Sequence, residues 1–307
     1  MNMPMSAESA EATTSQDGGF PLLAYFGHHK CASGWTTNIF REICFYMGRT
    51  FRVVHRPVDF EQDGSLGAHV RKQRVDFLAH TNANREHVLD LPPYRGFHVV
   101  RDPRDILVSA YFSHRYSHGT STWPELAAHR ERLQKLSKDD GLFAEMEFNE
   151  AFFEDMATWD YGQEHILELH MEDLTADPDE GFLEIAAFLG ILAPREPASL
   201  SHTVRARMNR LNRRGRDYMP RNLPLFPVPH QRLHTIPHST IDRIIDRFRF
   251  SKLAGGRERG QENKNSHYRK GKPGDWKNHF TDAHVRAFKD RYNNLLLKLG
   301  YESDPDW

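Results

Sequence analysis

The sequence has little cysteine, no long apolar run and almost no net charge. Its 307 residues contain two cysteines, which excludes a disulfide scaffold and a cysteine-rich zinc module and suits a reducing cytosol. No run of 18 apolar residues occurs, so we expect no transmembrane helix and no membrane insertion. Lysine and arginine number 41 against 42 aspartates and glutamates. This balance excludes a globally basic nucleic-acid coat protein, and we expect no nucleic-acid partner.

The first residues also lack the features of a targeting signal. Residues 1–19 contain no lysine, no arginine and no apolar core, so they do not predict a secretory signal. Their serine, threonine, alanine, glutamate and glycine content predicts a disordered tail. We therefore expect a cytoplasmic protein made of this tail and a single domain over residues 20–307.

Short apolar runs alternate with amphipathic stretches in the rest of the chain. The pattern predicts strands over residues 21–27, 50–55, 75–79, 97–100 and 165–170, and an acidic loop over 59–67. It predicts helices over residues 35–47, from 102, over 179–190, 240–250 and 282–299, and mostly helix over 123–153. The first run is continuously apolar, which is typical of a strand buried on both faces. The alternation predicts a three-layer α/β fold, with a central parallel sheet covered by helices on both faces.

A loop rich in hydrogen-bond donors follows the first predicted strand. It reads His-His-Lys-Cys-Ala-Ser-Gly-Trp-Thr-Thr from position 28 and opens a helix, where unpaired N–H groups and the helix dipole favour an anion. Lys30 adds a positive charge, and Ser33 and Thr36 add hydroxyl groups. The loop therefore suits a phosphate, with an ordinary strand-to-helix turn as the alternative. It lacks the Gly-x-x-x-x-Gly-Lys-Ser/Thr pattern, which argues against ordinary ATP or GTP hydrolysis.

A second cationic position follows the fourth predicted strand. Arg101 stands at the strand's end, and Ser109 lies eight residues later in the following helix. An arginine suits a phosphate because its planar fork donates two parallel hydrogen bonds. The alternative is a structural arginine paired with Asp102 or Asp105.

A third cationic segment lies near the C-terminus. Arg269 and Lys270 precede Gly271, and glycine lets a backbone approach an anion closely. Taken by itself, this segment also fits a solvated basic turn.

The three segments together, in this order, resemble the sulfotransferases that use 3′-phosphoadenosine-5′-phosphosulfate (PAPS). Lys30-Cys31-Ala32-Ser33-Gly34-Trp35 is similar to the family's 5′-phosphosulfate loop, and Arg101 with Ser109 matches its 3′-phosphate motif. Residues 269–281 match the family's Arg-Lys-Gly-x-x-Gly-Asp-Trp-Lys-Asn-x-Phe-Thr without a gap. The resemblance covers residues 22–299 and implies the P-loop-NTPase-like sulfotransferase fold.

The resemblance implies an enzyme that transfers a sulfuryl group from PAPS to a hydroxyl or amine of a small or medium organic acceptor. The product of the donor is 3′,5′-adenosine bisphosphate (PAP), and no metal is implied. Trp35 and Phe250 are assigned to the adenine ring. The full set of implied cofactor-binding residues is Lys30, Cys31, Ala32, Ser33, Gly34, Trp35, Thr36, Arg101, Ser109, Phe250, Arg269, Lys270 and Gly271.

The acceptor must lose a proton as it attacks, which calls for a general base with a pKa near the working pH. His80 ends the third predicted strand, where the family has its catalytic histidine, and an ordinary histidine pKa of about 6.5 suits the task. A structural histidine is the alternative, and His28 and His29 are rivals beside Lys30. Lys30 is the second catalytic candidate, because it would neutralise charge on the leaving phosphate oxygen.

One segment has two interpretations that the sequence does not separate. Residues 205–221 hold seven arginines and one aspartate, and residues 223–230 hold three prolines. The region around 201–235 is either a lid over the acceptor or, in its arginine-rich part, a solvated helix face. Two other functions also stay open, namely a P-loop-type small-molecule kinase and a non-catalytic nucleotide-binding relative. Acceptor identity and oligomeric state are not indicated by the sequence.

Overall fold

Five parallel strands form the centre of the computed structural model, which describes residues 22–194, 200–218 and 232–307. The strands lie in the order β2-β3-β1-β4-β5. Their bounds are β1 Leu22–Gly27, β2 Phe51–Val54, β3 Phe77–His80, β4 Tyr94–Val100 and β5 Ile166–His170. Every neighbouring pair is parallel, as the sequence predicts.

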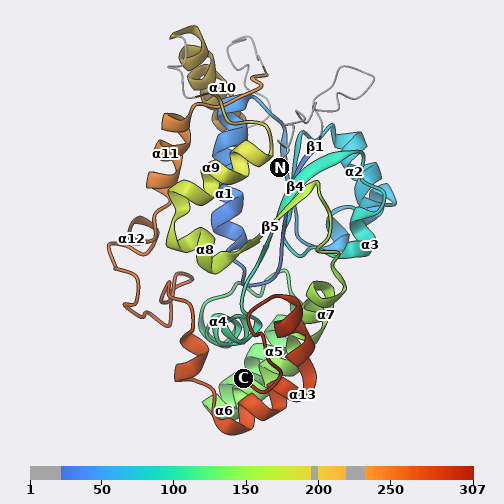
Figure 1. The fold of residues 1–307 in the computed structure, drawn as a ribbon, viewed down its shortest axis with the longest axis vertical. Coiled ribbons are helices and arrows are strands. Elements are labelled where there is room, and N and C mark those ends of the chain that lie inside the picture. The colour runs from blue at the N-terminus through green and yellow to red at the C-terminus, as the bar shows by residue number, and fades with distance from the viewer. Residues whose placement is uncertain (1–21, 195–199, 219–231) are drawn as a thin grey trace, which may run out of the picture.

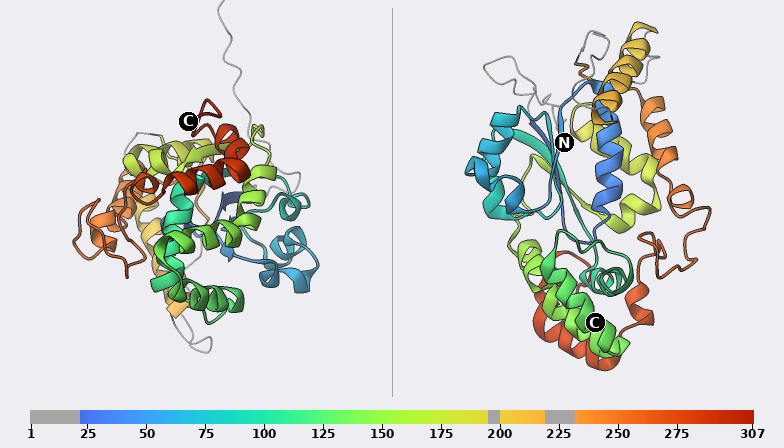
Figure 2. Two further views of the ribbon diagram at one scale, coloured as in Figure 1. Left: turned by 90° about the horizontal axis from the view of Figure 1, so that it is seen from below. Right: turned by 180° about the vertical axis from the view of Figure 1, so that it is seen from behind.

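Helices cover both faces of this sheet (Figures 1 and 2). Side chains alternate along a strand, so Leu23 and Tyr25 of β1 face one layer while Ala24 and Phe26 face the other. The first layer contains α1 (Ser33–Met47), α8 (Met171–Ala176), α9 (Pro178–Phe188) and α11 (His238–Arg247); the second contains α2 (Leu66–Gln73) and α3 (Arg85–Val88). The predicted three-layer α/β fold is therefore confirmed.

A separate group of helices gathers below the sheet in Figure 1, at the carboxyl edge of the strands. It comprises α4 (Pro103–Tyr116), α5 (Pro124–Lys135), α6 (Lys138–Phe148), α7 (Glu150–Thr158) and α13 (Asp282–Lys298). The stretch predicted as mostly helical thus divides into three helices, and the Ser137 side chain caps the second of them. Parallel strands end at one edge, so the loops after β1, β3 and β4 meet this helix group. Open α/β sheets bind ligands at such an edge.

The predicted acidic loop ends in a helix, and the arginine-rich segment takes the helical one of its two interpretations. Residues 66–73 form α2, a helix that the sequence analysis did not predict; the Ser65 hydroxyl accepts from the Ala68 N–H and starts it. The arginine-rich segment forms α10 (Leu200–Tyr218), a regular helix. It packs on the C-terminal half of α1, where Arg210 Nε lies 2.9 Å from Glu42 Oε2. Figure 1 shows α10 at the top, at the opposite end of α1 from the loop that contains Lys30.

The remaining elements are short. They are η1 (Pro57–Asp59), η2 (Glu61–Asp63), α12 (Phe250–Leu253) and η3 (Asp275–Asn278). Across the described ranges, no helix is both long and apolar enough to cross a membrane. The predicted tail at residues 1–19 and the proline-containing stretch at 223–230 lie outside the described residues.

Candidate functional site

The loop between β1 and α1 is held in a shape that suits an anion. Cys31 is fully buried among Val100 and Ile106, so its side chain fixes the loop to the core. Lys30 and Ala32 on either side adopt left-handed backbone angles, with φ of 63° and 56°. The first turn of α1 contains no acidic residue, and no side chain caps it. The N–H groups of Trp35 and Thr36 donate to the Ala32 carbonyl at 3.0 and 3.1 Å, whereas those of Ser33 and Gly34 have no partner within the described chain and can meet a ligand's negative charge.

Arg101 lies against this loop at the end of β4. Its Nη1 donates to the Lys30 carbonyl oxygen at 3.0 Å, which brings together two segments 71 residues apart. Two buried polar atoms nearby, Arg101 Nε and Thr37 Oγ1, have no hydrogen-bond partner within the described chain. Buried donors usually have partners, so these two atoms fit a site completed by an anionic ligand.

The charge on Lys30 is sensitive to its surroundings. Burial, together with the positive charges of Arg101 and Arg269, lowers the Lys30 pKa to about 7, and Glu145 opposes the shift. The C-terminal cationic segment is tied to the helix that follows Arg101, because the Asp105 carboxylate accepts from the Gly274 and Trp276 N–H groups. The structure thus brings all three predicted cationic segments to one edge of the sheet.

The C-terminal cations are held by a buried carboxylate. Asp275 is 3% exposed and accepts from Arg269 Nη2 at 2.5 Å and from Lys270 Nζ. Burial would raise the pKa of Asp275, but hydrogen bonds from His279, Lys270, Asn278 and Arg269 hold that pKa well below its usual range. The guanidinium of Arg269 also lies over the Phe112 ring, 4.5 Å from its centroid. Both cations are therefore oriented by the protein itself.

Asp105 joins this segment to the helix that follows Arg101. It is 1% exposed and accepts from the backbone N–H groups of Gly274 and Trp276 at 2.6 and 2.9 Å. Asp105 therefore does not pair with Arg101 by a hydrogen bond, which was the structural alternative in the sequence analysis. Asp102 instead pairs with Arg104, so Arg101 keeps its donors for the loop.

The predicted adenine residues lie near one another. Trp35 Nε1 donates to the Phe248 carbonyl at 2.8 Å, two residues before Phe250. Gly271 has a φ of +67°, and a Cβ built there would lie 2.6 Å from the Phe250 ring. Glycine is therefore required at this position. Ser109 lies half-buried on α4, one turn before Phe112 and on the same face of the helix.

The histidine predicted as the base is enclosed. His80 is 0% exposed, with Nδ1 3.5 Å from the Val54 carbonyl and Nε2 3.4 Å from His87 Nδ1. Burial and then the charge of His87 lower the His80 pKa to about 4. The charge of Lys30 contributes to the lowered pKa of four other histidines, His29, His114, His118 and His267.

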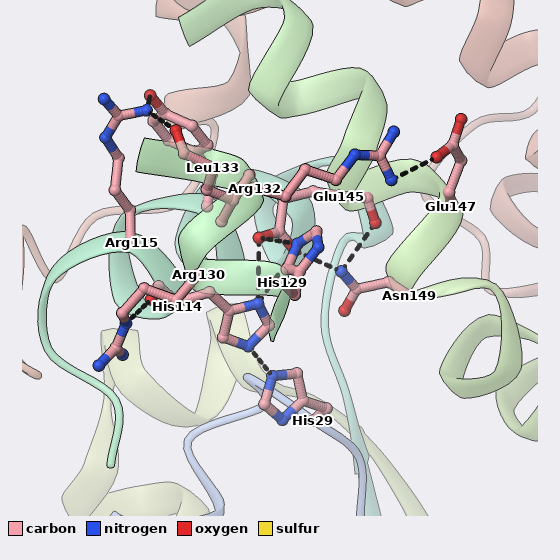
Figure 3. A network of polar contacts seen from close by, with 11 residues as sticks. His29, His114, Arg115, His129, Arg130, Arg132, Leu133, Glu145, Glu147 and Asn149 are labelled. Atoms are coloured by element: carbon pink, nitrogen blue, oxygen red, sulfur yellow. Dashed lines mark hydrogen bonds and ion pairs between the residues drawn. The ribbon is translucent and has the colours of Figure 1, made fainter. Parts of the chain in front are cut away.

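Several of these residues carry no signal that sequence reasoning used. Asp105 and Asp275 stand inside the quoted motifs, and their roles as anchors emerge only from the fold. His114, His129 and Glu145 come from three helices and lie within 4.8 Å of one another through their ligand-type atoms. Such a set can hold a divalent ion. Here the three side chains form hydrogen bonds to one another (Figure 3).

Comparisons with known proteins agree with this geometry. Residues 91–211 and 231–300 match the sulfotransferase domain family. The match includes Arg101, Ser109 and residues 269–271, whereas the Lys30 loop lies before it. No curated protein matches the chain at a significant level.

Three solved structures are similar to this chain over most of both lengths. Mouse sulfotransferase SULT7A1 complexed with PAP has a TM-score of 0.51 and 16% identity, covering 91% of this chain and 85% of that chain. At this identity the similarity shows the fold alone. Two retinol dehydratase structures, one with androsterone and inactive cofactor PAP and one with retinol and PAP, have TM-scores of 0.42 and 0.41. Each has 15% identity and covers 90% of this chain and 82% of that chain.

Replacing the anchor Asp105 tests the structural link between the cationic segments. We expect Asp105→Ala to lower the free energy of unfolding by about 2–3 kcal/mol, because two N–H groups lose a charged partner. We also expect faster tryptic cleavage after Arg269 and Lys270. Urea denaturation and limited proteolysis measure both effects. Asp242→Ala, at an exposed position of α11, is the control and should change neither. Equal stability of the two variants would contradict the anchoring role.

Proposed function

The chain belongs to the sulfotransferase family, and on this basis we propose that it transfers a sulfuryl group from PAPS to a hydroxyl or amine of a small organic acceptor. The observation that carries the proposal is the contact between Arg101 and the Lys30 carbonyl, with Asp105 holding the C-terminal cationic segment against the helix that follows Arg101. A donor with phosphate groups at two ends needs positive charge at two ends of one pocket. The three cationic segments provide this arrangement.

The 5′ end of the donor would bind at the start of α1. There the Lys30 side chain, the unpaired N–H groups of Ser33 and Gly34 and the hydroxyl groups nearby would meet the phosphosulfate. Left-handed geometry at Lys30 and Ala32 supports this role, because it turns successive N–H groups toward one concave side. The Cys31 side chain points into the core, so its contribution is limited to its backbone.

The 3′-phosphate would bind between α4 and the C-terminal segment. Arg101, Ser109 and Arg269 supply donors there, with Lys270 and the Gly271 backbone beside them. Arginine forks match phosphate oxygens in pairs, which fixes the direction of the nucleotide. Trp35 and Phe250 would then meet the adenine ring. The hydrogen bond from Trp35 to the Phe248 carbonyl and the closeness of the Phe250 ring to Gly271 support this assignment.

The chemistry asked of the protein is mainly positioning and charge compensation. As the acceptor attacks sulfur, the bond to the phosphate oxygen breaks, and Lys30 stabilises the charge that develops on that oxygen. The acceptor's proton goes to a histidine. The sequence predicts His80 for this role, and that assignment stays a prediction. The cytoplasmic location and the single domain over residues 20–307 are likewise proposals. Within the predicted lid around 201–235, α10 packs on the C-terminal half of α1, away from the Lys30 loop, so we do not propose that this helix covers the acceptor.

A transfer assay tests the proposal. We expect the wild type to release PAP from PAPS, without added metal, with at least one member of a panel of phenols, steroid alcohols, sugars and amines. Lys30→Ala and Arg101→Ala should each lower kcat/KM by about 100-fold or more, because a preorganised cation is lost. Lys135→Ala, at an exposed position of α5, is the matched control and should retain full activity.

Other outcomes of this assay would favour the remaining functions. Magnesium-dependent phosphate transfer from ATP would replace the proposal with a kinase. Tight PAP binding with no transfer to any acceptor would favour a non-catalytic relative. Full activity of both cation variants, with an intact fold, would contradict the assigned donor site.

The low pKa of Lys30 predicts that donor binding takes up a proton. In the free protein this amine has a pKa of about 7, and a bound polyanion must raise it. At pH 8 binding should therefore take up close to one proton, and PAP affinity should fall by up to about tenfold per pH unit above 7. Calorimetry in buffers of different ionisation enthalpy measures the uptake. Lys30→Arg should remove it, because arginine stays charged; equal uptake in both proteins would contradict the prediction.

A further inference from the structure

A chain of side chains leads from the Lys30 loop to a buried carboxylate (Figure 3). His29 Nε2 lies 2.9 Å from His114 Nε2, and His114 Nδ1 lies 3.0 Å from both oxygens of Glu145. Glu145 is 0% exposed and also contacts His129 Nε2 at 3.0 Å and Asn149 Nδ2 at 2.8 Å. The chain is thus continuous from the residue beside Lys30 to a fully buried acid.

The hydrogen-bond partners determine where the protons lie. Burial would raise the pKa of Glu145, but His114 and His129 outweigh it and hold the acid ionised. An ionised carboxylate only accepts, so His114 Nδ1 carries a hydrogen. In neutral His114 the Nε2 atom then carries a lone pair and accepts from His29 Nε2. His29 therefore has its own lone pair on Nδ1, as a general base requires.

Within the described residues, His29 Nδ1 has no protein partner, and the ring lies among other aromatic rings. The residue is 9% exposed. Phe152 stacks on the ring at 4.8 Å, and Trp123 meets it edge-on at 5.6 Å. In Figure 3 the second ring nitrogen of His29 points away from His114. An organic acceptor beside these rings would present its hydroxyl next to Lys30.

The surroundings of His80 suit a general base less well than those of His29. Both of its ring nitrogens face protein atoms, the Val54 carbonyl and His87, and none of its surface is exposed. Within the described residues, no carboxylate forms a hydrogen bond to the ring of His80 or to that of His87.

We propose that, within the transferase function proposed above, His29 rather than His80 accepts the acceptor's proton and His114 with Glu145 carries the resulting charge away. As the acceptor oxygen bonds to sulfur, its proton moves to His29 Nδ1. The Nε2 proton of His29 moves to His114 Nε2, and His114 becomes an imidazolium paired with Glu145. The electron pair of the broken S–O bond stays on the phosphate oxygen of PAP beside Lys30. His29 ends neutral, with its proton on the other nitrogen.

The relay explains how a depressed histidine can act as a base. Burial and then the charges of His114 and Lys30 lower the His29 pKa well below its usual range, and His118 and His267 act in the same direction. A proton that stayed on His29 would lie beside these positive groups. A proton on His114 instead lies beside the negative charge of Glu145. His114 and Glu145 are in this sense positioning residues, and His29 is the catalytic one.

A second series of hydrogen-bonded side chains, which starts in the same loop, provides a matched control. His28 Nε2 lies 2.8 Å from His98 Nε2, and His98 Nδ1 lies 2.6 Å from Glu168 Oε2. The connectivity is the same, but His28 is only 2% exposed and its electrostatic partners are His98 and His80 rather than Lys30. This second series of side chains has no part in the proposed transfer.

The test compares Glu145→Gln, His29→Asn and the control Glu168→Gln by their pH profiles of kcat and their PAP affinities. Loss of the Glu145 charge weakens the base, so we expect kcat to fall about 10- to 100-fold and its acid limb to move to lower pH. His29→Asn should remove the acid limb and lower kcat by about 100-fold or more. PAP affinity should change little in either variant. Glu168→Gln should match the wild type in every measurement.

Three results would overturn the relay. The first is loss of the acid limb in His80→Asn while His29→Asn keeps it. The second is a Glu145→Gln profile identical to that of Glu168→Gln. The third is loss of activity in a chelator that zinc restores, which would make the same side chains a metal centre.

A spectroscopic measurement tests the relay independently of turnover and of variant folding. Nitrogen-15 NMR of the wild-type histidine rings should show His29 protonated at Nε2 and His114 protonated at Nδ1. His29 protonated at Nδ1 would overturn the relay. Because this readout needs no acceptor, failure of the proposed function, in which PAP binds but no transfer occurs, is distinguishable from failure of the relay.

Discussion

The structure depends on bringing like charges together before any ligand arrives. Lys30, Arg101 and Arg269 come from three distant segments, and burial, followed by repulsion from the two arginines, lowers the pKa of the lysine. Buried carboxylates offset that repulsion, with Asp275 holding Arg269 and Asp105 holding the backbone of the same segment. The protein thereby keeps a cluster of cations that its own side chains hold in place, and a polyanionic donor would complete it.

The same region handles charge in two opposite ways. Cations converge where the donor's phosphates would lie. The buried Glu145 lies at the other end of the hydrogen-bonded series His29–His114–Glu145. Sulfuryl transfer needs both features, because negative charge develops on the leaving group while a proton leaves the acceptor. In the proposed mechanism, residues 29 and 30 serve these two needs, and the acceptor would lie between them and the aromatic rings of Trp123 and Phe152.

Much of the fold could be predicted from the sequence, and less of the site. The five strands follow from short apolar runs, and the three cationic segments follow from motifs that stand at strand or helix ends. The helix α2 was missed because it is short and its cap is one serine. The hydrogen-bonded series His29–His114–Glu145 could not be predicted from the sequence. Its neighbouring members are 85 and 31 residues apart, and no local pattern links them. Only the packing of α4 and α6 brings them together.

A calorimetric titration with PAP, without metal, tests the central claim most directly. Wild type and Arg101→Ala are compared, because Arg101 is the residue that joins the loop to the rest of the pocket. The account predicts micromolar or tighter binding to the wild type and loss of most of that affinity in the variant. Absence of binding to folded wild type, or equal affinity in the two proteins, would contradict it.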